Sequence, residues 1–285
     1  MRLAGRDSLD RVTRFSAVLF GAGDFRTRTE ARPLPPPVHP GDRLALGPLH
    51  ARIVGLHEHP RLLALEFEGS PAAIWEGLAA HGKPIQYAHM PSPLALWDTW
   101  TPIAGPPVAF EPPSAGFVLD WDALASIRSR GVRFATITHA AGISSTGDPA
   151  LDALLPFDEP YRIPASTAEA IRVARRRGAR IIAIGTTVVR AIEHAGRLDA
   201  VVRSGDGVAS QRIDGSSCLR VVRALLSGTH EPGTSHYDML RAFASERTLG
   251  RIARELDEHG YLTHEFGDSV FLDDGRQTEG IQLAC

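Results

Sequence analysis

The sequence has few cysteines, no long apolar run and almost no net charge, and each shortage argues against a class of protein. Its two cysteines, Cys218 and Cys285, cannot build a disulfide framework or a metal-thiolate site, which fits a reducing compartment. No stretch of about 18 apolar residues occurs, and the N-terminus lacks a secretory signal pattern. We therefore expect a cytoplasmic protein that neither spans nor binds a membrane.

The charge balance gives no overall attraction for nucleic acid. The chain has 31 Lys and Arg residues against 33 Asp and Glu residues, a net charge of −2. A protein that holds a nucleic-acid backbone usually carries a basic field, so this balance counts mildly against RNA as a substrate. The densest basic run, Arg175-Arg176-Arg177, is either a solvated helix end favoured by the helix dipole or a phosphate clamp.

The 285 residues, 43% of them hydrophobic, suffice for a main domain and a small second one. A strand is expected within 14–20, and the proline-rich segment 32–40 is an extended connector. Three short strands are typical of a small antiparallel barrel or sheet, and they are expected at 43–46, 51–56 and 62–67. We therefore expect a β-rich domain at 38–75, inserted into a main domain formed by 1–37 and 76–285.

Beyond Trp75 the pattern changes to helices that alternate with strands. Helices or partly helical segments are expected at 120–130, 166–177, 188–195, 220–226, 237–244 and 249–259. Strands are expected at 134–138, 180–184, 261–265 and 269–272. Ser166 and Glu169 have the spacing of a capping box, and the apolar run 180–184 is typical of a strand buried on both faces of a parallel sheet. The main domain is therefore expected to be α/β with a mostly parallel sheet.

The clearest candidate site is Gly185-Thr186-Thr187, between the expected strand 180–184 and a helix. Unpaired N–H groups at such a helix start favour anionic groups at the carboxyl edge of the sheet, and the two hydroxyls add donors. The alternative is ordinary N-capping. Arg190 and Glu193 follow on the same helix, where they form a surface pair or line the same crevice.

Three further loops concentrate polar groups. The segment 227–236 is dense in histidine, acid and hydroxyl groups, although surface histidine is the ordinary explanation. Gly267-Asp268, inside a strand-like run, marks a bulge or a close approach to a ligand. His139 follows an apolar run in a loop of small residues. None of these loops matches a metal-binding, nucleophile-elbow, Walker or dinucleotide motif.

Taken in order, these loops resemble the S-adenosylmethionine:tRNA ribosyltransferase-isomerase family of queuosine biosynthesis. Gly82–Ile85 is similar to the family's G-x-P-(L/I) motif, and Pro113–Gly116 to its P-(T/S)-A-G motif. Ile184–Glu193 is very similar to V-G-T-T-(S/V)-V-R-x-L-E, the most specific match. Ser227–Ala244 and Phe266–Ser269 resemble its T-x-(F/W)-H-x-P and (Y/F)-G-D-(A/S) stretches. The resemblance runs from about Gly82 to Leu272.

This resemblance implies a main α/β domain plus an inserted small antiparallel β-barrel. It also implies S-adenosylmethionine as co-substrate, with no metal. The family moves the ribosyl part of that molecule onto a 7-aminomethyl-7-deazaguanine base in tRNA and releases adenine and methionine. The sulfonium acidifies the neighbouring ribose carbon, so a base can remove its proton.

The resemblance also assigns site residues. Those expected to hold S-adenosylmethionine are Gly185, Thr186, Thr187, Arg190, Ser114, Ala115 and Gly116. Those expected to be catalytic are His230, Glu193 and Asp268. Those expected to contact the acceptor are His139, Glu231, Thr234, Ser235 and Glu265. Among them, His230 is the first candidate for proton transfer, because an unperturbed imidazole titrates near neutral pH.

Several family positions are replaced. Val118 and Phe157 stand at two histidine positions, and Gly233 stands at a lysine position. Together with the lack of positive charge, this favours an enzyme of the same fold that uses a small-molecule acceptor without tRNA, whereas the family resemblance favours tRNA. A module that binds nucleotide or RNA and has lost its chemistry is the third alternative.

Overall fold

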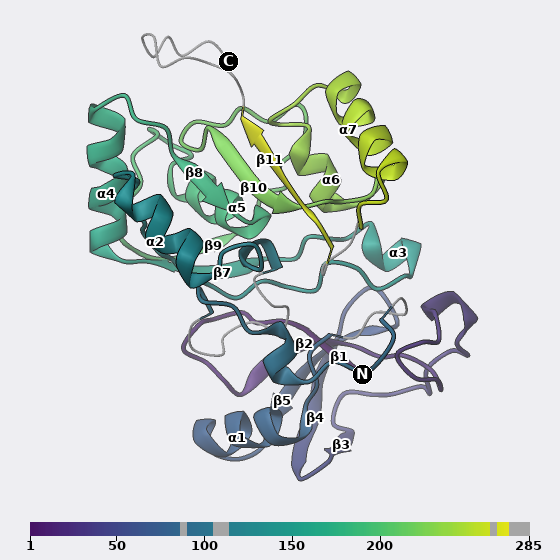
Figure 1. The fold of residues 1–285 in the computed structure, drawn as a ribbon. Coiled ribbons are helices and arrows are strands. Elements are labelled where there is room, and N and C mark those ends of the chain that lie inside the picture. Colours follow the sequence, from purple (N-terminus) through teal and green to yellow (C-terminus); the bar gives the residue numbers. More distant parts are fainter. Residues whose placement is uncertain (86–89, 105–113, 263–266, 274–285) are drawn as a thin grey trace. The chain divides into compact units, whose positions relative to one another are not determined.

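The computed structural model describes residues 1–85, 90–104, 114–262 and 267–273 of a mixed α/β chain (Figure 1). The chain divides into two compact units. The first unit comprises residues 1–100, 105–112 and 140–160, and the second comprises 101–104, 113–139 and 161–285. None of the described helices combines the length and the apolar character needed to cross a bilayer.

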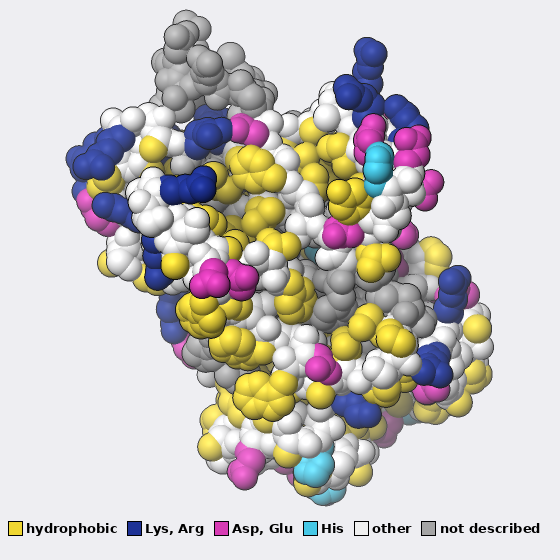
Figure 2. All heavy atoms as spheres, viewed as in Figure 1, with side chains coloured by type: hydrophobic (Ala, Val, Ile, Leu, Met, Phe, Trp, Pro, Cys, Tyr) yellow, Lys and Arg dark blue, Asp and Glu magenta, His cyan; other side chains and the backbone are white. Residues whose placement is uncertain are grey.

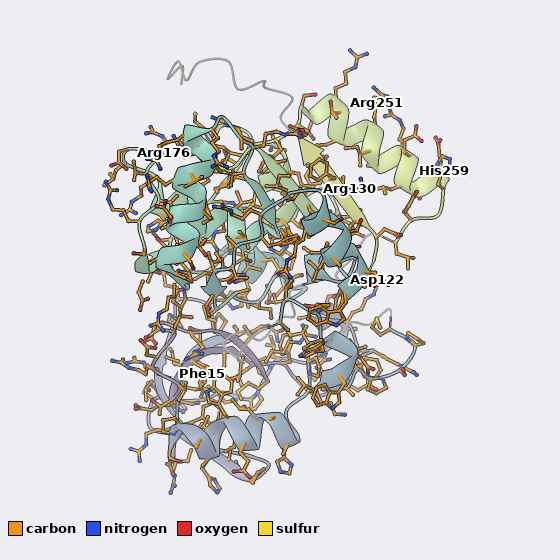
Figure 3. The ribbon with its side chains drawn as sticks, turned by 60° about the vertical axis from the view of Figure 1, so that its left-hand side comes forward. Phe15, Asp122, Arg130, Arg176, Arg251 and His259 are labelled. Atoms are coloured by element: carbon orange, nitrogen blue, oxygen red, sulfur yellow. The ribbon has the colours of Figure 1, made fainter. Side chains whose placement is uncertain are left out.

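The first unit is built on a five-stranded antiparallel sheet in the order β1-β2-β5-β4-β3. Its strands are β1 (Arg2–Gly5), β2 (Arg14–Val18), β3 (Arg43–Leu46), β4 (Leu49–Leu56) and β5 (Leu62–Phe67). Helix α1 (Pro71–His81) packs closely on β4, since a Cβ at its Gly77 would lie 2.6 Å from a Leu49 methyl carbon. Phe15 belongs to the resulting core and meets Phe67 edge-on at 5.3 Å (Figure 3).

The expected strands 43–46, 51–56 and 62–67 are confirmed as β3, β4 and β5, and the strand within 14–20 as β2. The domain boundary differs from the expectation, because β2 pairs with β5 and brings residues 1–37 into the same unit as 38–75. The described pairings leave β1 and β3 as the two edges of an open sheet, so they do not close a barrel. The unit also contains the short helices η1 (Thr29–Ala31), η2 (Leu96–Thr99) and α3 (Pro149–Asp152).

The second unit contains two three-stranded sheets, ordered β11-β10-β8 and β6-β7-β9. Their strands are β6 (Thr138–His139), β7 (Glu159–Ile163, whose first two residues belong to the first unit), β8 (Ile182–Ile184), β9 (Gly205–Ala209), β10 (Ala224–Gly228) and β11 (Ser269–Asp273). The helices are η3 (Ser114–Gly116), α2 (Trp121–Ser129), α4 (Ala165–Arg176), α5 (Thr186–Ala195), α6 (Ser235–Leu240) and α7 (Glu246–Glu258). The core includes Val189, Val222, Leu225 and Leu249, which join α5, β10 and α7 around one apolar centre.

A mostly parallel sheet is not what the described strands form. β8 and β10 are parallel, whereas the β10–β11 and β6–β7 pairs are antiparallel. The run 180–184 yields only the three-residue strand β8, and Ile182 is 43% exposed because β8 is an edge of its described sheet. The expectation of a strand buried on both faces was therefore wrong.

Three other local expectations also differ. Residues 220–226, expected to be helical, contain the start of β10, because pairing with both β8 and β11 favours the extended backbone. Only Thr138 of 134–138 lies in a strand, β6. Of the strand expected at 261–265, Tyr261 and Leu262 are not in a strand, and the remainder lies outside the described residues.

Helix α4 begins one residue before the expected start, and it has no capping box. Its N-cap is Pro164, which offers no side-chain acceptor, and Glu169 forms an ion pair with Arg172 on the next turn instead. Basic side chains gather over α4 (Figure 2), and Arg176 lies at its end (Figure 3). Because Arg175 donates to the carbonyl of Arg220 at 3.0 Å while Arg176 and Arg177 are exposed, this run is a solvated helix end in the structure.

Candidate functional site

Three of the expected loops meet at one edge of the β11-β10-β8 sheet. Because β8 and β10 are parallel, the loops that follow them leave from the same edge. β11 runs antiparallel to β10, and Ser269 at its start faces Gly228 at the end of β10. The sheet therefore brings together residues 185–187, 229–235 and 267–268, which we call the site edge.

Gly185 makes the sharp turn from β8 into α5. Its φ is +95°, in a region that side-chain-bearing residues rarely adopt, and its N–H donates to the carbonyl of Leu226 at 2.8 Å. A Cβ at this position would lie 3.7 Å from the Cβ of Ala115, so η3 with Ser114 and Gly116 is beside the turn. Since Gly185 has no side chain to cap the helix, the first N–H groups of α5 receive no cap from it.

The two threonines after Gly185 open α5. Thr186 is buried, whereas Thr187 is half-buried. Backbone N–H groups at a helix start, at the positive end of the helix dipole, favour an anionic group such as a carboxylate. The arrangement is therefore suited to an anionic ligand that approaches the Gly185 backbone closely.

His230 stands on the loop after β10 and is held by a hydroxyl. Its Nε2 lies 3.0 Å from Oγ of Ser227, and its ring centroid lies 4.8 Å from that of His236. Burial, and secondarily the neighbouring His236, lowers the pKa of His230 to about 3. His230 is therefore a neutral imidazole at neutral pH, and its role in proton transfer stays a prediction.

The side of His230 toward α7 offers little space. A pocket of about 20 Å³ is lined by Thr229, His230, Tyr237 and apolar side chains of α6, α7 and β11. That volume holds about one water molecule and no nucleoside.

Thr234 and its neighbours form the start of α6. The Thr234 hydroxyl accepts from the Tyr237 N–H at 3.1 Å and donates to the Glu231 carbonyl at 2.9 Å. Ser235 is the first residue of the helix, and Glu231 is exposed. All three lie at the site edge, but the Thr234 hydroxyl is engaged in N-capping rather than free for a substrate.

Asp268 joins the two ends of the segment 262–268. Its Oδ2 accepts from the Leu262 N–H at 2.9 Å, and its own N–H donates to the Leu262 carbonyl at 2.9 Å. Thr229 adds to this junction, since its hydroxyl donates to the Leu262 carbonyl at 2.9 Å and its N–H donates to the Asp268 carbonyl at 3.1 Å. Sequence reasoning did not single out Thr229, whose partners are about 33 and 39 positions away in the chain. Glu265 and His264 lie outside the described residues.

Glu193 does not line the site edge with a free carboxylate. It is 8% exposed, and it accepts hydrogen bonds from three consecutive backbone N–H groups, those of Arg220, Val221 and Val222, at 2.8, 2.9 and 2.7 Å. These residues lead directly into β10. Of the two alternatives for Arg190 and Glu193, the surface pair does not form, because Glu193 is a buried tie between α5 and the chain before β10.

Arg190 has a comparable position on the same helix. It is 2% exposed and donates to the carbonyls of Ala209 and Gln211 at 2.9 and 3.2 Å. The Gln211 amide returns a bond to the Arg190 carbonyl at 2.8 Å. In this structure Arg190 holds α5 to the chain after β9, and its contact with a ligand stays a prediction.

His139 lies on β6, in the other sheet of the second unit, and not on an element of the site edge. Burial lowers its pKa to about 4. Among the described residues, its Nδ1 is a buried nitrogen without a hydrogen-bond partner. β6 contacts α5, the helix that begins at the site edge, so His139 lies on a neighbouring element of that edge.

Comparison with known proteins gives a consistent family. The profile of a family described as "Queuosine biosynthesis protein" matches residues 15–272. Proteins named S-adenosylmethionine:tRNA ribosyltransferase-isomerase match from Geobacter sulfurreducens (32% identical, 56% of this chain, 48% of that protein) and Sorangium cellulosum (34%, 83% and 66%). The protein of that name from Thermus thermophilus is 31% identical and covers 82% of this chain and 67% of its own length.

A solved S-adenosylmethionine tRNA ribosyltransferase from Thermotoga maritima is 23% identical over 82% of this chain and 66% of that chain, with a TM-score of 0.46. The present chain spans about half the length of the Geobacter relative and about two thirds of the other two. Because the family profile extends over most of the sequence, the assignment concerns the chain as a whole and not one motif. The chain belongs to the queuosine biosynthesis protein family.

Proposed function

We propose that this chain is a transferase that moves the ribosyl moiety of S-adenosylmethionine onto a 7-aminomethyl-7-deazaguanine base in tRNA, with release of adenine and methionine. The observation that carries the proposal is the meeting of the Gly-Thr-Thr, His-Glu-Pro and Gly-Asp loops at the site edge. Relatives that carry the activity in their names support it. Those names also refer to tRNA, which outweighs the mild argument against RNA from net charge.

Residues at the start of α5 would hold S-adenosylmethionine. The absence of a side chain at Gly185 lets a ligand contact the backbone, and the N–H groups of Thr186 and Thr187 suit the carboxylate of the methionine part. The threonine hydroxyls and η3 would bind the ribose side. S-adenosylmethionine itself supplies a sulfonium that acidifies the adjacent ribose carbon.

His230 would take the proton on a nitrogen of its neutral imidazole, which the lowered pKa makes a weaker base than an unperturbed imidazole. Asp268 would act by fixing the segment beside it rather than by touching the substrate. Arg190 and Glu193 would act by holding α5, and therefore Gly185–Thr187, in register with β10. No step requires a metal ion.

The exposed loop from Glu231 to Ser235 would meet the acceptor, together with Glu265 and His139. Gly233, exposed with φ of +90°, stands where the family pattern has a lysine, and this favours the alternative of a small-molecule acceptor. We further propose that the sheet β1–β5 corresponds to the inserted β domain of the family and that the second unit corresponds to its α/β domain. The reaction is proposed to take place in the cytoplasm.

One experiment separates the alternatives. The purified chain is incubated with S-adenosylmethionine and one of three acceptors: tRNA carrying the precursor base, the same tRNA without it, or the free base. Adenine and methionine are quantified by mass spectrometry. We expect equimolar release only with precursor-bearing tRNA. Release with the free base alone would replace tRNA by a small acceptor, and binding without release under all three conditions would leave a module without chemistry.

A further inference from the structure

We propose that Ser227 is a positioning residue that fixes the orientation and tautomer of the His230 imidazole, and that Thr229 fixes the backbone on which this imidazole stands. The inference deepens the proposed function and rests on it only for the claim that His230 transfers a proton. Neither residue was among those expected from the sequence to take part in binding or catalysis.

Ser227 is a rigid support for the ring. It lies within β10, where it stands opposite Val270 of β11, and it is 2% exposed. Its neighbour Leu226 stands opposite both Phe271 of β11 and Ile184 of β8, so the strand is held from two sides. The Oγ–Nε2 distance of 3.0 Å is that of a hydrogen bond. A hydroxyl on a doubly paired strand therefore sets where Nε2 lies.

Thr229 restrains the chain from the other side of Gly228. Its N–H donates to the Asp268 carbonyl at 3.1 Å, and its hydroxyl donates to the Leu262 carbonyl at 2.9 Å. Thr229 is 2% exposed, so water does not compete strongly for these bonds. Because it directly precedes His230, the imidazole is anchored through its own Nε2 and through the residue before it.

The serine hydroxyl can either accept from Nε2–H or donate to Nε2, and we assign it the acceptor role, which leaves Nδ1 available. A neutral imidazole carries one N–H, and the nitrogen engaged by Ser227 is Nε2. When Nε2–H donates to the serine oxygen, Nδ1 is the acceptor. Nδ1 then takes the proton of the acidified carbon, whose bonding electron pair stays on that carbon, and the resulting imidazolium keeps its Nε2–H bond to Ser227. The same hydroxyl thus serves the ring in both protonation states.

The test compares Ser227→Ala with Ser227→Thr, which retains a hydroxyl, and Thr229→Val with Thr229→Ser. Two readouts are used on the full chain: kcat and KM with S-adenosylmethionine and precursor-bearing tRNA, and the imidazole tautomer from two-bond ¹H–¹⁵N NMR correlations of ¹⁵N-histidine protein. The sequence contains 12 histidines, so a His230→Gln spectrum identifies the signal.

We expect the wild type to show the Nε2–H tautomer alone, and Ser227→Ala to show a mixture. In Ser227→Ala, kcat is expected to fall about 10- to 100-fold with KM for S-adenosylmethionine changed less than about 3-fold, since a misoriented base costs rate rather than affinity. Ser227→Thr is expected to restore most of the rate. Thr229→Val is expected to lower kcat in the same way, and Thr229→Ser to retain it.

An unchanged tautomer in Ser227→Ala would overturn the positioning role, and so would a loss confined to KM. A wild type without turnover would count against the proposed function alone, because the tautomer comparison does not depend on activity. If Ser227→Ala does not fold, the Ser227→Thr and Thr229→Val spectra decide the question: a mixed tautomer in Thr229→Val with a single one in Ser227→Thr supports the inference, and any other pair of spectra opposes it.

Discussion

Replacement of Glu193 by Gln tests the tie between α5 and β10. The carboxylate receives the N–H of Val221 and Val222 on Oε1 and that of Arg220 on Oε2. Glutamine retains one oxygen and puts an NH₂ group in place of the other. The two N–H groups of Val221 and Val222 therefore stay bonded, while the Arg220 N–H faces another donor.

The expected loss of stability follows from these three bonds. A hydrogen bond to a charged group contributes about 1.5–3 kcal/mol, and bonds to a neutral acceptor are roughly half as strong. One lost bond and two weakened ones give a loss of about 3–6 kcal/mol in the free energy of unfolding. Unfolding in urea measures this loss, with Glu255→Gln as the control, because the Glu255 side chain is 68% exposed and its pairing with His259 contributes little.

Hydrogen exchange locates the effect. The amides of Arg220, Val221 and Val222 are expected to exchange faster in Glu193→Gln, whereas those of α7 do not change. A loss below about 1 kcal/mol, or unchanged exchange at these three amides, would refute this prediction. The three hydrogen bonds to Glu193 would then contribute no more to stability than the bonds that a solvated carboxylate makes with water.

Three further predictions concern the buried histidines and the α5 turn. The folded-state pKa values of His230 and His139, about 3 and about 4, lie below the unfolded value of about 6.5, so the unfolded chain binds more protons in between. The free energy of unfolding is therefore highest above about pH 6.5 and decreases as the pH is lowered, by about 2 kcal/mol per histidine at pH 5. Urea unfolding of His230→Gln should show about half of this pH dependence. A pH dependence equal to that of the wild type would contradict the burial of His230. Gly185→Ala places a side chain at φ +95° and should lower the free energy of unfolding by about 1–2 kcal/mol, and calorimetry should show weaker binding of S-adenosylmethionine. The control Gly250→Ala lies in open space on α7 and should raise the free energy of unfolding by about 0.5–1 kcal/mol. Arg190→Met removes the bonds to Ala209 and Gln211 and should lower the melting temperature by several degrees in scanning calorimetry, and a melting temperature equal to that of the wild type would show that those bonds add nothing.

Local patterns predicted the elements whose interactions are mostly local. The alternation of apolar and polar residues predicted β3, β4 and β5, because one face of an antiparallel sheet packs on a core while the other meets water. Helix α7 was predicted from its apolar spacing and begins at the Ser245 cap. The segment 220–226 failed as a prediction, since its apolar residues fit either periodicity and only the strands on both sides decide for β10.

The candidate site divides in the same way. Gly185–Thr187 were identified from their own sequence, because a strand followed by Gly-Thr-Thr and a helix specifies the turn locally. The order of the motifs along the chain indicated the family, and the family implied S-adenosylmethionine. The convergence of 229–235 and 267–268 on that turn depended on strand order and direction, which residues far apart in the chain determine.

By itself, then, the sequence determined the short strands of the first unit, most helices of the second and the Gly-Thr-Thr turn, since these follow from side-chain periodicity and backbone preferences over a few residues. Only the tertiary structure decided that Glu193 and Arg190 bind backbone groups some 20–30 residues away, that His230 is neutral, and that Ser227 and Thr229 hold it. The physical reason is that a buried polar group must find its partner among whichever groups folding brings within about 3 Å, and that its pKa depends on how completely the folded chain excludes water.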